Sequence, residues 1–390
     1  MNTIKTTRIE SLDLLKGLVM VIMALDHVRD YFHYEAFFFD PTDPDKTNAA
    51  IYFTRWITHY CAPAFSFLAG ISAFLVGRRK SKKDLSLFLL SRGIWLVFIE
   101  VSVVGFAWFF DIEFGTIALQ VIWSLGISMI VLALFIHLPL KVILIMSLII
   151  IFGHNALDYL HMERSVWWGI VHEFNVFRLD SGKVLVTGYP LLPWIGVMSL
   201  GYYFGKFYDT DFSAEKRRKA FNIIGIAAIM LFFTIRLING YGNPKHWQAY
   251  EELSKTVFSF MDPLKYPPSL AYLLMTLGPA LLVLANTEQL RGRISYFFKV
   301  FGRVPFFYYI LHLYVIHGLA VITAELTGFG WESMILKKWV TLSEQLDGYG
   351  FSLPYVYLIW ILVVLALYPL CKKFSEYKMA HKEKKWLSYF

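Results

Sequence analysis

The sequence has few charged residues for its length. Only 17% of its 390 residues are Asp, Glu, Lys or Arg, whereas about a quarter of a typical soluble domain is charged. Hydrophobic residues make up 57% of the chain and aromatic residues 18%. This composition argues against a soluble domain and predicts a membrane protein that crosses the bilayer several times.

Cysteine is nearly absent, and several catalytic motifs are missing. Cys61 and Cys371 are too few for a disulfide framework, and the span order below places them near opposite membrane faces. The sequence has no HxxxH or CxxC pattern, so no metal site is predicted. It also lacks the glycine-rich motifs of nucleotide-binding loops and the GxSxG motif of serine esterases.

Apolar stretches of spanning length recur along the whole chain. A membrane span needs roughly 20 apolar residues, and this length predicts about ten spans in a single domain, residues 1–390. The expected fold class is an all-α, polytopic transmembrane helical bundle. The spans are expected near residues 12–32, 52–77, 85–109, 116–137, 139–157, 185–208, 219–239, 269–287, 304–326 and 354–372.

The net charge of +8 comes from short basic clusters between these spans. One alternate set of loops holds more than twice as many Lys and Arg residues as the other. The positive-inside rule therefore places both termini in the cytoplasm, which an even number of spans allows. A membrane protein explains the basic charge better than a nucleic-acid-binding protein does, and the lipid bilayer is its first expected partner.

The first span carries ionisable residues at its outer end. Asp26, His27, Arg29 and Asp30 follow a long apolar run. Ionisable groups at membrane depth are costly unless they face a cavity or a partner, so they indicate a functional site. The second span runs back inward and places Arg55 and His59 at a similar depth.

His27 is the preferred catalytic residue in this group. A carboxylate beside an imidazole fixes its tautomer and raises its basicity, which suits a general base. Asp26 or Asp30 is expected to orient His27, with His59 in support. The structural alternative is that Asp26–Arg29 and Asp30–Arg55 pairs only neutralise one another.

Other polar residues in the spans give weaker signals. Arg92 and Glu100 fall on roughly one face of the third span, where Arg92 either reaches the cytoplasmic interface or meets an anionic phosphate. His312 and His317 lie on the ninth span, and Tyr309 precedes His312 by about one turn. A histidine among aromatic residues is often a packing residue, so a packing role and a functional role both stay open for this pair.

Five segments together resemble a known family. They are RIESLDLLKGLVMVIMALDHVRDYF, RWITHYCAPAFSFLAGISAFL, SRGIWLVFIE, GYPLLPWIGVMSLGYYFGK and FGRVPFFYYILHL. In this order they are similar to bacterial membrane proteins grouped with heparan-α-glucosaminide N-acetyltransferase. The most specific parts are the opening of Ser11, Asp13, Lys16 and Gly17, the Asp26–His27 pair and the YPLLPW stretch.

The resemblance implies a membrane acyltransferase. Such an enzyme takes an acyl group, expected to be acetyl, from acyl-CoA in the cytoplasm and delivers it to an amine or hydroxyl of a sugar or glycoconjugate on the far side. Acetyl-CoA is thus the implied donor substrate, and the bacterial cytoplasmic (inner) membrane is the implied location. No nucleic acid is expected as a partner, and a homodimer is one option for the oligomeric state.

The same hypothesis assigns roles to individual residues. Lys16, Arg78 and Arg92 are expected to hold the CoA phosphates, and Arg55 or Tyr309 to stabilise the oxyanion. Arg29, His312 and Trp194 are further expected contacts of the substrate.

Two alternatives remain open from the sequence. In the lysosomal member of the resembled family the active histidine lies further into the following loop, which makes His33 a rival to His27 and His59. The second alternative is a proton-coupled secondary transporter that uses the Asp/His/Arg cluster as a proton relay.

Overall fold

The computed structural model describes residues 9–162 and 165–390. Helices dominate this part of the chain, so the predicted all-α fold class is confirmed. The α-helices are α1 (Glu10–Phe32), α2 (Ala49–Ile57), α3 (Cys61–Gly77), α4 (Lys82–Ile99), α5 (Gly105–Phe109), α6 (Val121–Phe135), α7 (Leu140–Gly153), α8 (Val166–Val171), α9 (Leu191–Phe204), α10 (Ala214–Ile238), α11 (Leu253–Phe260), α12 (Leu270–Thr287), α13 (Arg293–Arg303), α14 (Pro305–Leu326) and α15 (Leu353–Ala380). A π-helix, η3 (Glu100–Val104), joins α4 to α5, and 3₁₀ segments are η1 (Tyr34–Phe37), η2 (Thr58–Tyr60), η4 (His154–Tyr159), η5 (Gly205–Tyr208), η6 (Trp331–Met334), η7 (Val340–Leu342), η8 (Glu344–Leu346) and η9 (Lys385–Tyr389).

Among the described residues, seven helical segments are long and apolar enough to cross a membrane. α1 has 23 residues, a similar length, but charged residues toward both of its ends, among them Asp13, Lys16, Asp26 and Arg29, shorten its uncharged apolar stretch. α6 and α9 are shorter, with 15 and 14 residues. The chain is thus a polytopic membrane protein, while the count of ten spans and the cytoplasmic termini stay predictions. The seven segments are Ala49–Gly77, Lys82–Phe109, Leu140–Tyr159, Ala214–Ile238, Leu270–Thr287, Pro305–Leu326 and Leu353–Ala380.

A small sheet replaces the start of two expected helical spans. The strands β1 (Thr116–Ala118), β2 (Val176–Arg178) and β3 (Val184–Val186) pair in the order β1-β3-β2, and β1 runs parallel to β3. The helices expected from residues 116 and 185 therefore begin only at α6 and α9. Pro190 immediately precedes α9, and a residue before proline is driven away from the helical conformation, which explains the later start of α9.

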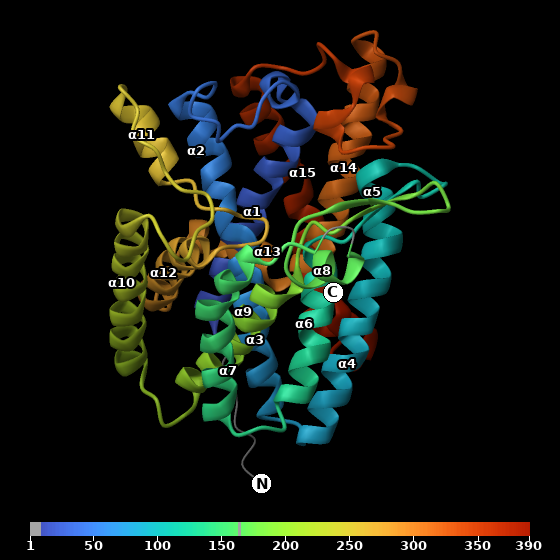
Figure 1. Cartoon of the computed structure of the whole chain (residues 1–390). Helices are drawn as coiled ribbons and strands as arrows, with labels where there is room; N and C mark the ends of the chain where they lie inside the picture. The colour runs from blue at the N-terminus through green and yellow to red at the C-terminus, as the bar shows by residue number, and fades with distance from the viewer. Residues whose placement is uncertain (1–8, 163–164) are drawn as a thin grey trace.

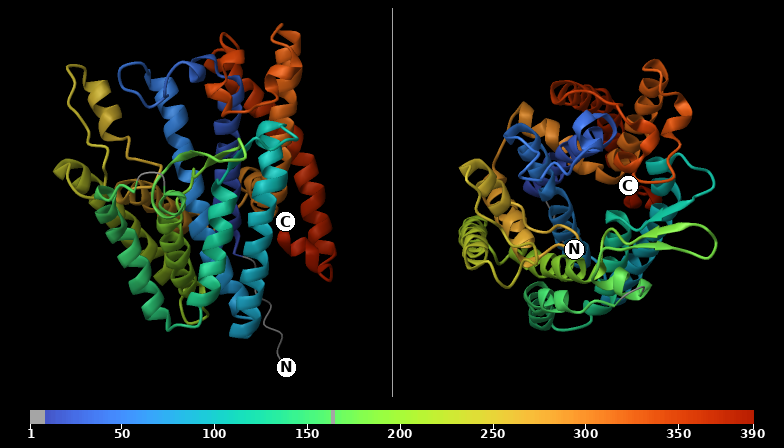
Figure 2. Two further views of the ribbon diagram at one scale, coloured as in Figure 1. Left: turned by 45° about the vertical axis from the view of Figure 1, so that its right-hand side comes forward. Right: turned by 45° about the horizontal axis from the view of Figure 1, so that its top comes forward.

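α1 lies inside the bundle and organises it. Most of its residues are buried, and it packs against α3, α12, α13, α14 and α15. Figure 2 shows α1 enclosed by these later parts of the chain, and Figure 1 shows α2, α11 and the loop between α14 and α15 gathered at one end of the bundle, the upper end in that view.

Two glycines bring α1 unusually close to α13. A Cβ atom at Gly17 would lie 1.7 Å from the carbonyl oxygen of Phe298, and one at Gly302 would lie 1.8 Å from the carbonyl oxygen of Asp13. Real Cβ atoms do not approach backbone atoms this closely, so any larger residue would push the helices apart. Gly17, part of the opening motif in the sequence, thus has a packing role.

Candidate active site

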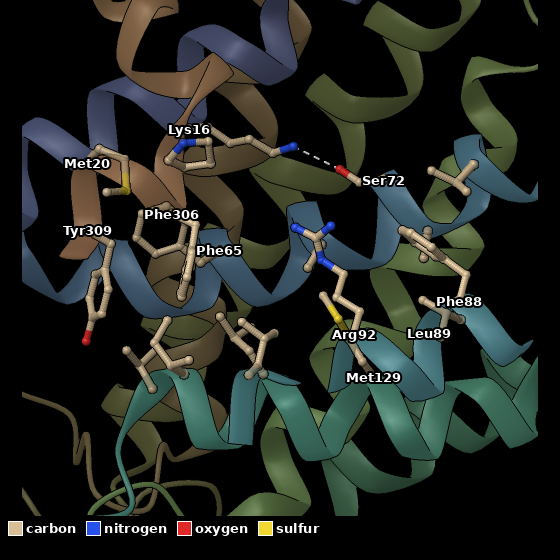
Figure 3. Close-up of a pocket in the computed structure, with 18 of the residues that line it drawn as sticks. Lys16, Met20, Phe65, Ser72, Phe88, Leu89, Arg92, Met129, Phe306 and Tyr309 are labelled. Atoms are coloured by element: carbon tan, nitrogen blue, oxygen red, sulfur yellow. Dashed lines mark hydrogen bonds between the residues drawn. The ribbon is translucent and has the colours of Figure 1, made fainter. Parts of the chain in front are cut away.

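A cavity of about 230 Å³ lies between α1, α3, α4, α6 and α14. Its walls are mainly Met, Phe, Leu and other apolar side chains, with Lys16, Arg92 and Tyr309 as polar exceptions that can carry charge. Figure 3 shows the Arg92 guanidinium pointing toward Lys16 and Ser72, with Tyr309 further along the cavity. The full lining is Lys16, Met20, Met23, Phe65, Ala69, Ser72, Ala73, Val76, Phe88, Leu89, Arg92, Leu96, Val121, Ile122, Leu125, Met129, Pro305, Phe306 and Tyr309.

The two cations in the cavity have different surroundings. Lys16 Nζ donates a hydrogen bond to Ser72 Oγ at 2.8 Å. Arg92 donates to the carbonyl oxygen of Ser388 and lies over the Tyr389 ring, because the segment after α15 folds back onto α4. Arg92 therefore meets the backbone of this segment, and it does not extend to a free interface.

Arg78 lies elsewhere. Its guanidinium bonds the carbonyl oxygen of Tyr208 at 3.2 Å and lies 3.3 Å from Asp209, at the end of α3. It does not line the cavity. Of the three cations expected to hold CoA phosphates, the structure thus brings two together and separates the third.

His27 contacts His312, and this contact fixes the tautomers of the neutral pair. His312 Nδ1 lies 2.9 Å from the Tyr308 carbonyl oxygen, which only accepts hydrogen bonds, so Nδ1 carries the hydrogen. His312 Nε2 is then the acceptor for His27 Nδ1, at 2.7 Å. His27 Nε2 is left with its lone pair free, as a base or a nucleophile requires.

The histidine pair adjoins the end of the cavity. Met23, which lines the cavity, lies one helical turn before His27 on α1. The Tyr309 ring, also in the lining, is centred 6.4 Å from the His27 ring, and the Trp108 ring is centred 4.8 Å from it. Trp108 Nε1 is buried and has no hydrogen-bond partner among the described residues.

The carboxylates near His27 are engaged with arginines. Arg55 Nη1 donates to both Asp26 oxygens, at 2.8 and 2.7 Å, and Arg29 Nη2 lies 3.1 Å from Asp26 and 2.6 Å from Asp30. The expected orienting contact between His27 and Asp26 or Asp30 is absent from the described structure. Both carboxylates are instead paired with guanidinium groups, while His312 orients the ring.

His59 lies beside this ion network but in a separate environment. Its carbonyl oxygen accepts a hydrogen bond from the Tyr272 hydroxyl at 2.7 Å, and its Nδ1 is buried without a hydrogen-bond partner among the described residues. Its ring makes no hydrogen bond to His27 there. The segment η2, which carries His59, packs against α1, and Arg55 Nη1 donates to the neighbouring Thr58 Oγ1 at 3.3 Å, so His59 borders the same site.

Lys265 is a cation that the sequence analysis did not single out. It lies in the loop between α11 and α12, is only 9% exposed, and its Nζ lies 5.1 Å from the centre of the Tyr266 ring. Burial alone would raise the pKa of Tyr266, but the cations of Lys265 and Arg55 outweigh burial and lower it. The signal available in the sequence was a lysine among Pro and Tyr residues in a long outer loop.

Three other residues named from the sequence lie outside the histidine pair. The ring of His33 is fully buried and lies 2.9 Å from Glu35. His317 is held between the carbonyl oxygens of Ala107 and Met334, which indicates a packing residue.

Trp194 is buried on α9, where its ring packs against Tyr189 and its carbonyl accepts from Ser66. Tyr189 in turn contacts Tyr266. Among the described residues, the aromatic contacts of Trp194 lead through Tyr189 to Tyr266, and Trp194 does not line the cavity.

Glu100 interrupts the third helical segment at η3. Its Oε2 accepts a hydrogen bond from the backbone nitrogen of Trp123 at 2.9 Å, and its Oε1 is buried without a partner among the described residues. It therefore caps the start of α6 and does not pair with Arg92. π-Helical turns of this kind often occur at functional sites.

One comparison with known proteins identifies a family. The model of the family described as heparan-alpha-glucosaminide N-acetyltransferase, catalytic, matches residues 8–242, which is more than half of the chain and includes α1, α3, α4 and α6. A comparison with curated proteins gives no significant match. The chain therefore belongs to the heparan-α-glucosaminide N-acetyltransferase catalytic-domain family.

Proposed function

We propose that the protein transfers an acyl group, most simply acetyl, from cytoplasmic acyl-CoA to an amine or hydroxyl of a sugar or glycoconjugate outside the cytoplasm. The observation that carries this proposal is the cavity that holds two cations and adjoins the His27–His312 pair. Lys16 and His27 are eleven residues apart on α1, a rise of about 17 Å along the helix. A long ligand is therefore needed to connect the two ends, and acyl-CoA carries its anionic phosphates and its thioester at opposite ends.

The charged and the apolar side chains of the cavity bind different parts of the donor. Lys16 and Arg92 bind the phosphate groups, since charge-assisted hydrogen bonds to oxyanions are among the strongest in proteins. Met20, Met23 and Phe306 contact the apolar parts of the arm. The thioester then lies next to His27.

His27 Nε2 acts on the acceptor. As a general base it takes the proton from the attacking amine or hydroxyl, the new bond to the acyl carbon forms, and the C–S bond breaks. The proton then passes from His27 to the CoA thiolate. In the alternative route Nε2 itself attacks the thioester, the C–S bond breaks and the CoA thiolate leaves. The acceptor then attacks the acyl-histidine, the acyl–nitrogen bond breaks, and the proton of the acceptor passes to the thiolate.

Donors near the pair stabilise the developing oxyanion. Tyr309 contacts the His27 ring, and the indole N–H of Trp108 has no partner among the described residues. Arg55 is less suited than the sequence suggested, because its guanidinium is committed to Asp26. The oxyanion role is therefore assigned to Tyr309 and Trp108.

The first test measures thermal unfolding of the detergent-purified protein with acetyl-CoA. Ligand that binds the native state raises the melting temperature by mass action. We expect a rise with acetyl-CoA and a smaller one with dephospho-CoA. No rise at millimolar acetyl-CoA, together with ion-dependent flux of a solute in vesicles, would replace the transferase by a transporter.

The second test follows transfer across a membrane. Protein in vesicles is supplied with acetyl-CoA on the side of Lys16 and with an amino sugar such as glucosamine on the opposite side. We expect acetylated sugar on the far side from the donor. Acetylation only when both substrates are on one side would contradict a transmembrane reaction.

A further inference from the structure

Residues 386–390, here called the strap, fold back against α4 and contact a cation of the donor cavity. Figures 1 and 2 mark this end of the chain beside α4. Arg92 Nη1 donates a hydrogen bond to the Ser388 carbonyl oxygen, and the Tyr389 ring is centred 6.0 Å from the guanidinium carbon. Arg92 also lines the cavity. The chain itself therefore occupies part of a cation that the donor phosphates need.

Aromatic contacts attach the strap to the wall of the same cavity. The Phe390 ring is centred 5.9 Å from that of Phe306, which lines the cavity, and 5.6 Å from that of Trp95. The Tyr389 ring is centred 5.2 Å from Trp95. Trp95 belongs to α4 and Phe306 to α14. The strap thus covers the junction of these two helices beside the cavity.

The strap is only partly packed against the rest of the protein. Its Leu387 is buried, but Trp386 is 51% exposed. A hollow of about 570 Å³ lies between the strap and α4, with Ile94 and Phe98 in its walls. Segments with few buried apolar contacts open locally at a low cost in free energy. The strap can therefore leave its position while the helices stay folded.

The donor and the strap compete for the same side of Arg92. A guanidinium binds phosphate best through two parallel N–H groups, and hydrogen bonds to an oxyanion are stronger than those to a neutral carbonyl. Nη1 of Arg92 is committed to the Ser388 carbonyl. A two-point phosphate contact that includes Nη1 therefore requires this carbonyl to withdraw.

We propose that the strap is an autoinhibitory segment that competes with the donor phosphates for Arg92. This inference rests on the proposed donor site and adds a conformational step to it. Without donor, the strap covers Arg92 and closes the junction between α4 and α14. The donor binds the released form better, so it shifts the equilibrium toward release. When the donor has left, the strap returns to Arg92.

The first experiment measures donor binding in the absence of an acceptor. Acetyl-CoA is titrated by calorimetry into four detergent-purified proteins: the wild type, a variant that lacks residues 386–390, Arg92→Met, and the two changes combined. We expect removal of the strap to lower the Kd for acetyl-CoA about three- to tenfold, the net contribution of one hydrogen bond. In the Arg92→Met protein the same removal should leave the Kd unchanged, because the contested cation is gone.

A point variant keeps the test valid if the truncated protein does not fold. Phe390→Ala removes the ring that contacts Trp95 and Phe306, while the chain keeps its full length. We expect it to lower the Kd for acetyl-CoA as well. Tyr159→Ala, at an 80% exposed tyrosine at the end of η4, is the matched control and should leave the Kd unchanged.

Proteolysis reports the release of the strap directly. Leu387 is 2% exposed, so chymotrypsin should cleave next to it slowly while the strap is docked. A ligand that binds the native state ordinarily protects a protein, because it lowers the population of opened forms. Acetyl-CoA should nevertheless speed the loss of the strap several-fold, and intact-mass spectrometry measures this rate.

The outcomes separate this inference from the proposed function. Equal Kd values for the wild type and the truncated protein, or strap cleavage that acetyl-CoA does not speed, would reject the autoinhibitory role and leave the donor site standing. Weaker binding after truncation would make the strap a part of the donor site and also overturn the inference. Failure of acetyl-CoA to bind any of the four proteins would reject the proposed function, and the inference with it.

Discussion

His27 Nδ1 and His312 Nε2 lie 2.7 Å apart, although 285 residues separate them in the chain. The pair joins α1 to α14, and the carbonyl of Tyr308 sets the direction of both hydrogen bonds. One histidine thereby orients the other, which leaves His27 Nε2 available for chemistry.

Replacement of His27 and His312 should have unequal effects. His27→Ala should lower kcat by about 10²–10⁴-fold or more, the usual contribution of a general base. His312→Ala should lower kcat less, with little change in the KM for acetyl-CoA, because it orients His27 without touching the donor. Steady-state acetyl-transfer kinetics measure both.

His312→Gln provides the informative comparison. The glutamine side-chain oxygen can accept the His27 Nδ1 hydrogen, so this variant should recover part of the loss. His161→Ala, at an exposed histidine, serves as the control. Wild-type kcat in His312→Ala would show that the pair has no role in catalysis.

The Asp26–Arg55 pair should stabilise the fold only as a pair. The side chains of Arg55 and Asp26 are 15% and 14% exposed, and Arg29 still pairs with Asp26 when Arg55 is replaced, so the loss should be smaller than the about 3–5 kcal/mol of a fully buried pair. Arg55→Met should therefore lower the melting temperature, whereas Asp26→Leu combined with Arg55→Met should recover part of the loss. A double variant less stable than Arg55→Met alone would contradict this account.

The donor cavity predicts a contrast between two arginines. Arg92→Met should raise the KM for acetyl-CoA about tenfold, since it removes a cation from the cavity lining. Arg78→Met should leave this KM unchanged, because Arg78 lies against Tyr208 and Asp209. Initial rates over a range of acetyl-CoA concentrations decide between the two. The opposite order of effects would place the phosphates at the end of α3.

The glycine contact between α1 and α13 can be tested with a matched pair of variants. Gly17→Ala places a methyl group against the Phe298 carbonyl and should cost at least about 1–3 kcal/mol. Gly318→Ala on α14 meets no atom within 4 Å and should be neutral or stabilising by up to about 1 kcal/mol. Thermal unfolding in detergent compares them, and equal stabilities would refute the close approach.

His33 should make stability depend on pH. Burial lowers its pKa below the usual value near 6.5, Glu35 opposes this shift and Arg29 adds to it. As the pH falls below about 6.5, the unfolded chain takes up the proton first. Stability contributed by neutral His33 is therefore present above that pH and is lost as the pH falls toward the lower folded-state pKa.

His33→Asn should flatten this dependence between pH 7.5 and pH 5. The melting temperature of the wild type is expected to fall more steeply over this range than that of the variant. Parallel curves would show that protonation of His33 is not linked to unfolding.

Apolar length was enough to predict the long helices, because a membrane span leaves a clear signal in sequence. The sheet was missed since β1 and β3 are three-residue segments that end only two and four residues before apolar helices, and periodicity cannot separate such cases. The start of α9 could have been predicted from Pro190, whereas no comparable residue precedes α6 in the sequence.

The site was predictable in part. His27, Arg29, Asp26 and Asp30 lie within one helix, so their proximity follows from helical spacing. The contact of His27 with His312 and the burial of Lys265 depend on how distant segments pack. No local pattern reports such contacts, which is why the carboxylates were expected to orient His27.

The contact between Gly17 and α13 has a consequence for the angular setting of the active site. Gly17 and His27 are ten residues apart on one continuous helix. The packing contact of Gly17 with α13 therefore determines the direction in which His27 points. One residue inserted between them would rotate His27 by about 100° and raise it by about 1.5 Å. The N-terminal half of α1 would remain packed against α13, while the imidazole of His27 would turn away from His312. The site therefore requires that these ten residues neither grow nor shrink in number.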